Sequence, residues 1–261
     1  MLHVTPPFMG IFFFGDLKYH NAMARLNSFY LPPEDWDVPF ILQGSEAKHL
    51  GKVLRTRVGD TVRLFDGCGR DGLFTVTGIT KSKVQLELKE ETSIADSRNI
   101  TLAIGWNKSS RRNWILEKSV ELQTRGLIFY QSEFSQGKVP AEIKESWNEK
   151  LVAAAKQCGN AWLPELQTVP GSIEKLIESS SSYDNKLFLY EKADNDTVPD
   201  NSVFAAESTL AVIGPEGGFS PREAELLIDN GFKPVSLGSS ILRWETAALL
   251  CMGTAYLERQ K

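Results

Sequence analysis

Two stretches near the end of the chain share one order of parts, which constrains the fold more than any other feature. Each begins as a short apolar run, passes through a glycine-containing loop and continues as a helix: "TLAVIGPEGGFSPREAELLI" (209–228) and "PVSLGSSILRWETAALL" (234–250). Strands that alternate with helices predict an α/β fold, in which helices cover both faces of a mostly parallel sheet. Ligands bind such sheets at the carboxyl ends of the strands, where both glycine loops fall.

The middle of the chain extends this alternation. Apolar runs predict further strands at 100–105, 126–130 and 186–190, and the pattern at 109–123 is helical. A second helix is predicted from Ala141, with Gly159 in the position of a C-cap. Its apolar side chains recur three or four residues apart: Ile143, Trp147, Leu151, Ala154 and Cys158. These elements predict one α/β domain over 99–261.

The first part of the chain has a different character. Residues 38–90 alternate β-forming residues with glycine turns, and Asp66-Gly67, Asp71-Gly72 and 80–83 are turn signals. A short helix that begins with Ser45 as its N-cap and runs to Leu54 precedes most of these strands. The pattern predicts a small β-barrel within 23–95, which the polar stretch 90–99 separates from the α/β domain.

Residues 1–22 fit neither domain well. They contain the apolar run 8–14, but they lack the charged start and the small-residue cleavage site of a signal peptide. We expect an upstream extension, with the domain beginning near Met23; an additional edge strand is the alternative.

Composition narrows the function classes. No apolar run in the 261 residues approaches the ~20 residues of a membrane span. The three cysteines and three histidines show no metal-ligand spacing, and thiols without a pairing pattern fit a reducing compartment, so we expect a cytoplasmic protein without a metal. The net charge of −4 gives no overall attraction to nucleic acid, although local basic patches remain compatible with it.

The loop "IGPEGGFSPRE" is not a phosphate loop, because GxxxxGK[ST] and GxGxxG are both absent and Glu216 would repel phosphate. A carboxylate instead suits a cationic ligand or a ribose hydroxyl. Ser220, Pro221 and Glu223 predict a capped helix start, so a purely structural turn explains this loop equally well. The second loop, with Arg243 and Glu245 near its helix, favours a crevice shared by both loops.

These motifs together carry a family resemblance. "IGPEGGFSPREAELL" followed by "LGSSILRWETAAL" resembles the signature of RsmE-type ribosomal RNA methyltransferases, which belong to the SPOUT (trefoil-knot) superfamily. Upstream, "EAKHLGKVLRTRVGDTVRLFDGCG" is similar to the PUA-like barrel of that family, and "NWILEKSVEL" and "AAAKQCGNAWLPEL" resemble its next two helices. The resemblance spans about residues 23–258.

The resemblance implies a knotted domain, a homodimer, and transfer of a methyl group from S-adenosylmethionine to N3 of a uridine in small-subunit (16S) rRNA. Arg243 would stabilise the developing uracil anion. Glu245 would orient Arg243 or act across the dimer, or it is only an acid that the helix macrodipole stabilises. The implied cofactor-binding residues are Leu189, Ile213, Gly214, Pro215, Glu216, Gly217, Gly218, Leu237, Gly238, Ile241 and Leu242.

RNA binding needs local positive charge, even on an acidic protein. Two basic clusters are candidates, although such runs are often only solvated surface. One lies in the barrel and one opens the α/β domain; their residues are Lys48, Lys52, Arg55, Arg57 and Arg63, and Lys108, Arg111, Arg112 and Lys118.

Several residues depart from the family pattern. Gln123 stands where a glycine is usual, and Phe134, Asn160 and the pair 239–240 stand where the family often has arginine. The side of the site that would bind the substrate has thus lost positive charge. This leaves two alternatives for the RNA target: the nucleotide that the family methylates, or a different nucleotide. Two further hypotheses concern the class of protein. One is a ribosome-assembly factor that binds RNA without catalysis, and one is a small-molecule methyltransferase of Rossmann type, which the absent glycine fingerprint disfavours.

Overall fold

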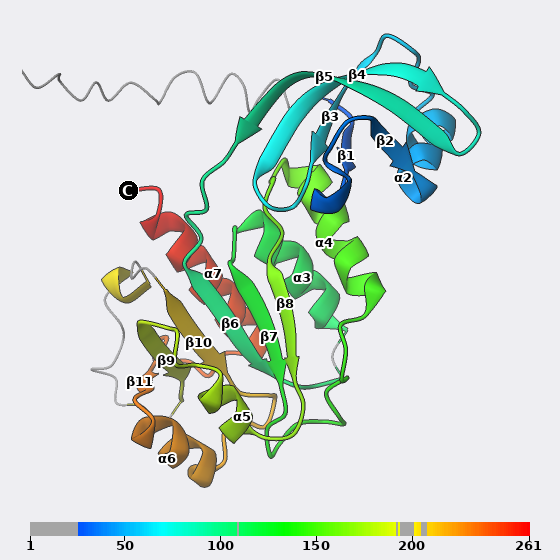
Figure 1. The fold of residues 1–261 in the computed structure, drawn as a ribbon. Coiled ribbons are helices and arrows are strands. Elements are labelled where there is room, and N and C mark those ends of the chain that lie inside the picture. The colour runs from blue at the N-terminus through cyan, green and yellow to red at the C-terminus, as the bar shows by residue number, and fades with distance from the viewer. Residues whose placement is uncertain (1–25, 109, 192, 194–200, 205–207) are drawn as a thin grey trace, which may run out of the picture. The chain divides into compact units, whose positions relative to one another are not determined.

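The structure is a computed structural model that describes residues 26–108, 110–191, 193, 201–204 and 208–261. The predicted extension, 1–22, lies outside the described residues. The chain divides into two compact units, shown in Figure 1. Among the described residues, the small unit comprises 26–66 and Arg70–Ser93, and the large unit comprises Gly67–Gly69 and those from Ile94 onward.

The small unit is built on a five-stranded sheet with the order β1-β3-β4-β5-β2. β1 runs parallel to β3, and the other pairs are antiparallel. The strands are β1 (Ser28–Tyr30), β2 (Phe40–Gln43), β3 (Thr61–Phe65), β4 (Arg70–Ile79) and β5 (Lys83–Ser93). Phe29, Leu42, Leu64, Phe74 and Val76 belong to its buried core, as the alternation of apolar residues requires.

Two local predictions in this unit are wrong. The helix α2 (Gly44–Lys48) begins two residues earlier than expected, with Gln43 rather than Ser45 as its N-cap, so Ser45 lies inside it. Asp71 and Gly72 form no turn but lie within β4, where Gly72 pairs with both β3 and β5. A Cβ atom on Gly72 would lie 2.8 Å from the ring of Phe74, so this glycine leaves room for core packing rather than bending the chain.

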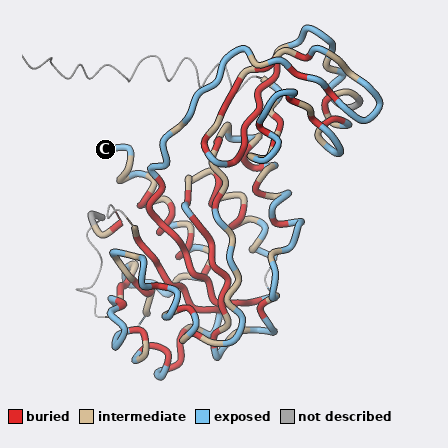
Figure 2. The backbone as a smooth tube through the Cα atoms, in the orientation of Figure 1, coloured by how far each residue is buried: buried red, intermediate tan, exposed pale blue. Residues whose placement is uncertain are grey.

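The large unit contains a six-stranded parallel sheet with the order β11-β9-β10-β6-β7-β8. The predicted strands β6 (Ile100–Gly105), β7 (Gly126–Tyr130) and β10 (Thr209–Ile213) are confirmed residue for residue. They are buried along their whole length, as Figure 2 shows in red. The remaining strands are β8 (Glu165–Val169), β9 (Asn185–Leu189) and β11 (Lys233–Val235).

Helices cover both faces of this sheet, as predicted. α5 and α6 share one core with Ala103, Ile128 and Phe188, whereas α4 packs against the opposite face, where Trp147 contacts Phe129. The helices are α3 (Arg111–Glu121), α4 (Glu145–Cys158), α5 (Ile173–Glu178), α6 (Pro221–Asp229) and α7 (Trp244–Glu258), and a 3-10 turn spans Asn201–Phe204. Gly159 ends α4 in the left-handed conformation (φ 76°), which confirms the predicted C-cap.

None of the helices that the structure describes has the length and apolarity needed to span a membrane. Within the same residues, no group of three or more His, Cys, Asp or Glu side chains could hold a metal ion.

Candidate functional site

The loop between β10 and α6 is held by the capping box that the sequence predicts. The Oγ atom of Ser220 accepts a hydrogen bond from the backbone N–H of Glu223 (3.2 Å), and Glu223 Oε2 accepts one from the N–H of Ser220 (3.1 Å). Pro221 takes the first helical position. The end of the loop is therefore fixed before any ligand is present.

The glycines of this loop pack tightly against their surroundings. Gly218 has a φ of 72°, and its N–H donates to the carbonyl of Pro215 (2.9 Å). A Cβ atom on Gly214 would lie 3.0 Å from the backbone of Gly218, so the loop folds closely onto itself. Gly214 and Pro215 are buried, whereas Glu216 and Gly217 are exposed.

A second loop, residues 131–138 after β7, packs along the glycine loop. Gln136 Nε2 donates to Glu216 Oε2 (3.2 Å), and the Cβ of Phe134 lies 3.0 Å from the position of a Cβ on Gly217. Glu223 accepts hydrogen bonds from the N–H of Glu133 (3.0 Å) and the hydroxyl of Ser132 (3.2 Å). The capping glutamate thus fixes both loops, a role that the capping pattern alone does not indicate.

The carboxyl ends of three neighbouring strands meet at this edge. Ile213 pairs with Leu189 of β9, which in turn pairs with Val235 of β11. Tyr130 of β7 donates from its hydroxyl to the carbonyl of Ile213 (3.2 Å). Burial, followed by the charge of Glu223, raises the pKa of Tyr130 well above its usual value, so this phenol acts as a proton-bearing donor.

The loop between β11 and α7 opens onto a cavity of about 520 Å³, a size suited to a small-molecule ligand. Gly238 adopts a φ of 117°, and a Cβ atom on it would have no neighbour within 4 Å. Of the predicted cofactor residues, Leu237, Gly238 and Leu242 line this cavity. The full lining is Leu237, Gly238, Ser239, Ser240, Leu242, Thr246, Leu249 and Leu250.

The remaining predicted cofactor residues are not among the residues that line this cavity. Leu189 and Ile213 end their strands, and the glycine loop begins directly after β10. Ile241 is 87% exposed. Leu250 is exposed and lines the cavity, whereas Ala247 and Cys251 of the same helix are buried.

Arg243 and Glu245 lie at the start of α7. Arg243 is the N-cap residue and its side chain is exposed. Glu245 lies in the first turn, with Oε1 3.9 Å from Nε of Arg111 at the start of α3. The ion pair described for Glu245 is therefore with Arg111 rather than with Arg243. As an acidic residue in the first turn of α7, Glu245 also interacts favourably with the helix macrodipole.

The barrel cluster of basic residues divides into exposed and buried members. Lys48, Arg55 and Arg57 are exposed, and the side chain of Lys52 lies outside what the structure describes. Arg63 is only 1% exposed, and its guanidinium binds both carboxylate oxygens of Asp71 (2.8–3.1 Å). The prediction that Arg63 contacts RNA is wrong in this structure, because the charge is buried and paired.

The second cluster contains exposed and half-buried members. Lys108 and Arg111 are exposed. Arg112 stacks 3.8 Å from the ring centroid of Trp106 and donates to the carbonyl of Asn107, and burial lowers the pKa of its guanidinium. Arg112 therefore has a structural role against the aromatic core, and its role as an RNA contact stays a prediction. Lys118 forms an ion pair with Glu121 (2.7 Å).

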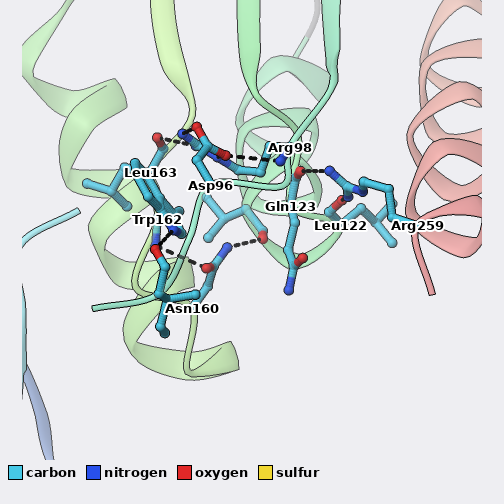
Figure 3. A network of polar contacts seen from close by, with 10 residues as sticks. Asp96, Arg98, Leu122, Gln123, Asn160, Trp162, Leu163 and Arg259 are labelled. Carbon is cyan, nitrogen blue, oxygen red and sulfur yellow. Dashed lines mark hydrogen bonds and ion pairs between the residues drawn. The ribbon is translucent and has the colours of Figure 1, made fainter. Parts of the chain in front are cut away.

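Asn160, where the family often has arginine, is a structural residue here (Figure 3). Its Nδ2 donates to the carbonyl of Val120 (3.0 Å), and its Oδ1 accepts from the N–H of Trp162 (3.0 Å). Trp162 in turn lies under the guanidinium of Arg98, 4.4 Å from the ring centroid. These contacts explain how this chain uses an asparagine at that position.

Comparison with known proteins identifies two matching domain families. Residues 95–256 match a family described as the RNA methyltransferase domain, and residues 42–89 match the RNA methyltransferase PUA domain. The five-stranded small unit is therefore PUA-like, and the large unit has the fold of the methyltransferase domain.

Individual relatives agree with these matches. The chain is 27% identical to ribosomal RNA small subunit methyltransferase E of Bacillus subtilis (strain 168), over 82% of this chain and 88% of that protein. It resembles the crystal structure of a probable rRNA-methyltransferase from Porphyromonas gingivalis (32% identity, TM-score 0.77, 90% and 99% of the two chains). It also resembles a ribosomal RNA small subunit methyltransferase E from Neisseria gonorrhoeae bound to S-adenosyl methionine (26% identity, TM-score 0.71, 87% and 95%).

Proposed function

Because the chain belongs to the RNA methyltransferase family of the RsmE type, we propose that it methylates N3 of a uridine in small-subunit (16S) rRNA, with S-adenosylmethionine as the methyl donor. The observation that carries this proposal is the joint match of both domains, 42–89 and 95–256, to the paired domains of one enzyme family.

The cavity beside α7 fits the proposed cofactor. Its lining is largely aliphatic, from Leu237, Leu242 and Leu249, and suits an adenine ring. Gly238 leaves backbone open to close approach, since nothing lies within 4 Å of its Cβ position. Exposed Glu216 is compatible with a cationic sulfonium. We propose that residues 213–218, Leu189 and Ile241 complete the binding site, and that the chain forms the knot of its superfamily.

When bound, S-adenosylmethionine supplies an electrophilic methyl group. The residues of this chain hold and polarise the other reactant. The exposed guanidinium of Arg243 is suited to donate two hydrogen bonds to the uracil oxygens, on which negative charge develops as N3 loses its proton. Positioning the uracil beside the methyl group supplies the other main part of the rate enhancement.

We propose that the enzyme acts as a cytoplasmic homodimer on the small ribosomal subunit or its RNA. Exposed apolar side chains near the cavity, Ile241 and Leu250, and Leu257 on the same helix, support a second copy as a cover. Exposed Lys48, Arg55, Arg57, Lys108 and Arg111 are the proposed phosphate contacts.

The test uses the purified chain, S-adenosylmethionine with a labelled methyl group, and 16S rRNA. We expect label in 3-methyluridine after digestion to nucleosides. Calorimetry with S-adenosylmethionine separates the competing hypotheses: an assembly factor without catalysis would bind no cofactor, and an enzyme with another RNA target would bind it and leave 16S rRNA unlabelled.

A further inference from the structure

Phe134 is an exposed aromatic residue on the candidate site. Its side chain is 47% exposed, on the loop that follows β7. The Cβ and Cγ atoms of Phe134 lie 3.0 and 3.4 Å from the position that a Cβ of Gly217 would occupy. The Phe134 side chain therefore rests against the glycine loop at a residue that has no side chain of its own.

The backbone under Phe134 is fixed on both sides. Ser135 N–H donates to the carbonyl of Ser132 (3.1 Å), and Ser135 Oγ accepts from the N–H of Ser132 (2.9 Å). Glu133 donates from its N–H to Glu223 (3.0 Å), and its carboxylate pairs with Arg222 (3.0 Å). These contacts hold the turn on either side of Phe134, whose half-exposed side chain lies beside the loop of Glu216.

A single exposed apolar side chain needs no explanation on most surfaces. Phe134 differs because it is preorganised, aromatic, and in contact with a loop of the proposed methyl-transfer site. Proteins that recognise single-stranded RNA stack unpaired bases on such rings. N3 lies on the pairing edge of uracil, so the base must be unpaired when it reacts, and stacking leaves that edge free.

We propose that Phe134 is the stacking platform for the target base. In this chain the aromatic ring would then hold the substrate at the sequence position where the family often has an arginine. This inference rests on the proposed function. Stacking requires only the face of the ring, so it replaces an arginine contact without adding charge to the site. In this proposal Arg243 donates hydrogen bonds to the edge of the base, and the ring of Phe134 stacks on its face.

Four variants test the platform. Phe134→Ala removes the ring, and Phe134→Leu keeps apolar bulk against Gly217 without a ring. Phe134→Tyr keeps the ring. Ile228→Ala, at another half-exposed apolar residue of the large unit, is the matched control. Steady-state methyl transfer to 16S rRNA gives kcat/KM, calorimetry gives the affinity for S-adenosylmethionine, and thermal unfolding gives stability.

Loss of the stacking contact with one base lowers the affinity for single-stranded RNA by about 5- to 150-fold. We expect a fall of this size in kcat/KM for both Phe134→Ala and Phe134→Leu. Phe134→Tyr and Ile228→Ala should keep the wild-type kcat/KM. All four variants should keep the cofactor affinity and the melting temperature of the wild-type chain. Full activity of Phe134→Leu would overturn the proposal, as would an equal loss of cofactor affinity in Phe134→Ala.

A binding measurement separates this inference from the proposed reaction. Fluorescence anisotropy with a single-stranded oligouridine needs no turnover, and Phe134→Ala should weaken binding about 5- to 150-fold while Phe134→Tyr should not. If the wild-type chain binds oligouridine through Phe134 but transfers no methyl group, the reaction is wrong and the platform stands. If binding is insensitive to Phe134, the platform is wrong whatever the activity.

Discussion

The guanidinium of Arg259 donates a hydrogen bond from Nη1 to the backbone carbonyl of Gln123 (3.0 Å), and Figure 3 shows the two side by side. Gln123 is in the left-handed conformation, with a φ of 51°, which costs a residue with a side chain about 1–2 kcal/mol. The family usually has a glycine there, and the structure shows why. The contact with Arg259 from the end of the chain helps to hold the strained residue in place.

Gln123→Gly should therefore stabilise the protein by about 1 kcal/mol, because glycine adopts this conformation without strain. Urea unfolding measures the difference. Gln123→Ala, which keeps a Cβ atom, should change little, whereas Gly159→Ala, at a φ of 76°, should destabilise by a similar amount. A less stable Gln123→Gly chain would contradict this account.

Arg63 and Asp71 should matter for stability rather than for RNA binding. The pair is buried in the small unit, so Asp71→Ala leaves an unpaired buried charge and should cost about 3–5 kcal/mol. Replacing both residues together, as Arg63→Met with Asp71→Leu, should recover most of that loss. Arg57→Ala is the exposed control: it should leave stability unchanged and reduce the salt dependence of RNA affinity by about one ion. Normal stability of Asp71→Ala would show that the pair is not buried.

Arg243→Ala should lower the rate of methyl transfer by about 10²–10³-fold, the usual effect of removing a donor that stabilises developing negative charge. Affinity for S-adenosylmethionine should stay close to that of the wild-type chain, since the Arg243 side chain is exposed and does not line the cavity. Single-turnover kinetics and calorimetry measure the two effects separately. Unchanged turnover would remove Arg243 from the mechanism.

Cys251 should resist alkylation. Burial raises the pKa of its thiol from 9.0 to about 12, so the reactive thiolate is almost absent at pH 8. Mass spectrometry after iodoacetamide treatment should find Cys68 and Cys158, both exposed, modified in the native chain, and all three cysteines modified after denaturation. Rapid labelling of native Cys251 would contradict its burial.

The same shift sets a pH dependence. The folded state favours the protonated thiol, so this contribution to stability is fully present below pH 9.0 and is lost as pH rises toward about 12. Urea unfolding at a series of alkaline pH values measures this loss of stability. The Cys251→Ser chain should lack the part of the loss that comes from ionisation of the Cys251 thiol.

Much of the large unit follows from local sequence signals. The strands 100–105, 126–130 and 209–213 are continuous apolar runs, and the capping box of Ser220 and Glu223 lies within four residues, so neighbours in sequence suffice to predict them. β8 is partly exposed and has only two apolar residues, and α5 has six residues, too few for a clear period. Local signals therefore reveal neither of these two elements.

The site itself depends on contacts between distant residues. The burial of Arg63 depends on its ion pair with Asp71 of β4, and the position of Arg112 depends on stacking with Trp106. Charge alone therefore could not separate these two arginines from the exposed members of their clusters. The contact between Phe134 and Gly217 likewise joins segments more than eighty residues apart, by their numbers, and has no local signal.

The central claim is methylation of N3 of a uridine in 16S rRNA, and mapping modified nucleosides tests it most directly. Small-subunit rRNA from a strain that lacks the gene is compared with rRNA from the same strain carrying the wild-type gene or Arg243→Ala. We expect one 3-methyluridine that is lost on deletion, returns with the wild-type gene and stays absent with Arg243→Ala. An identical 3-methyluridine map in all three strains would contradict it.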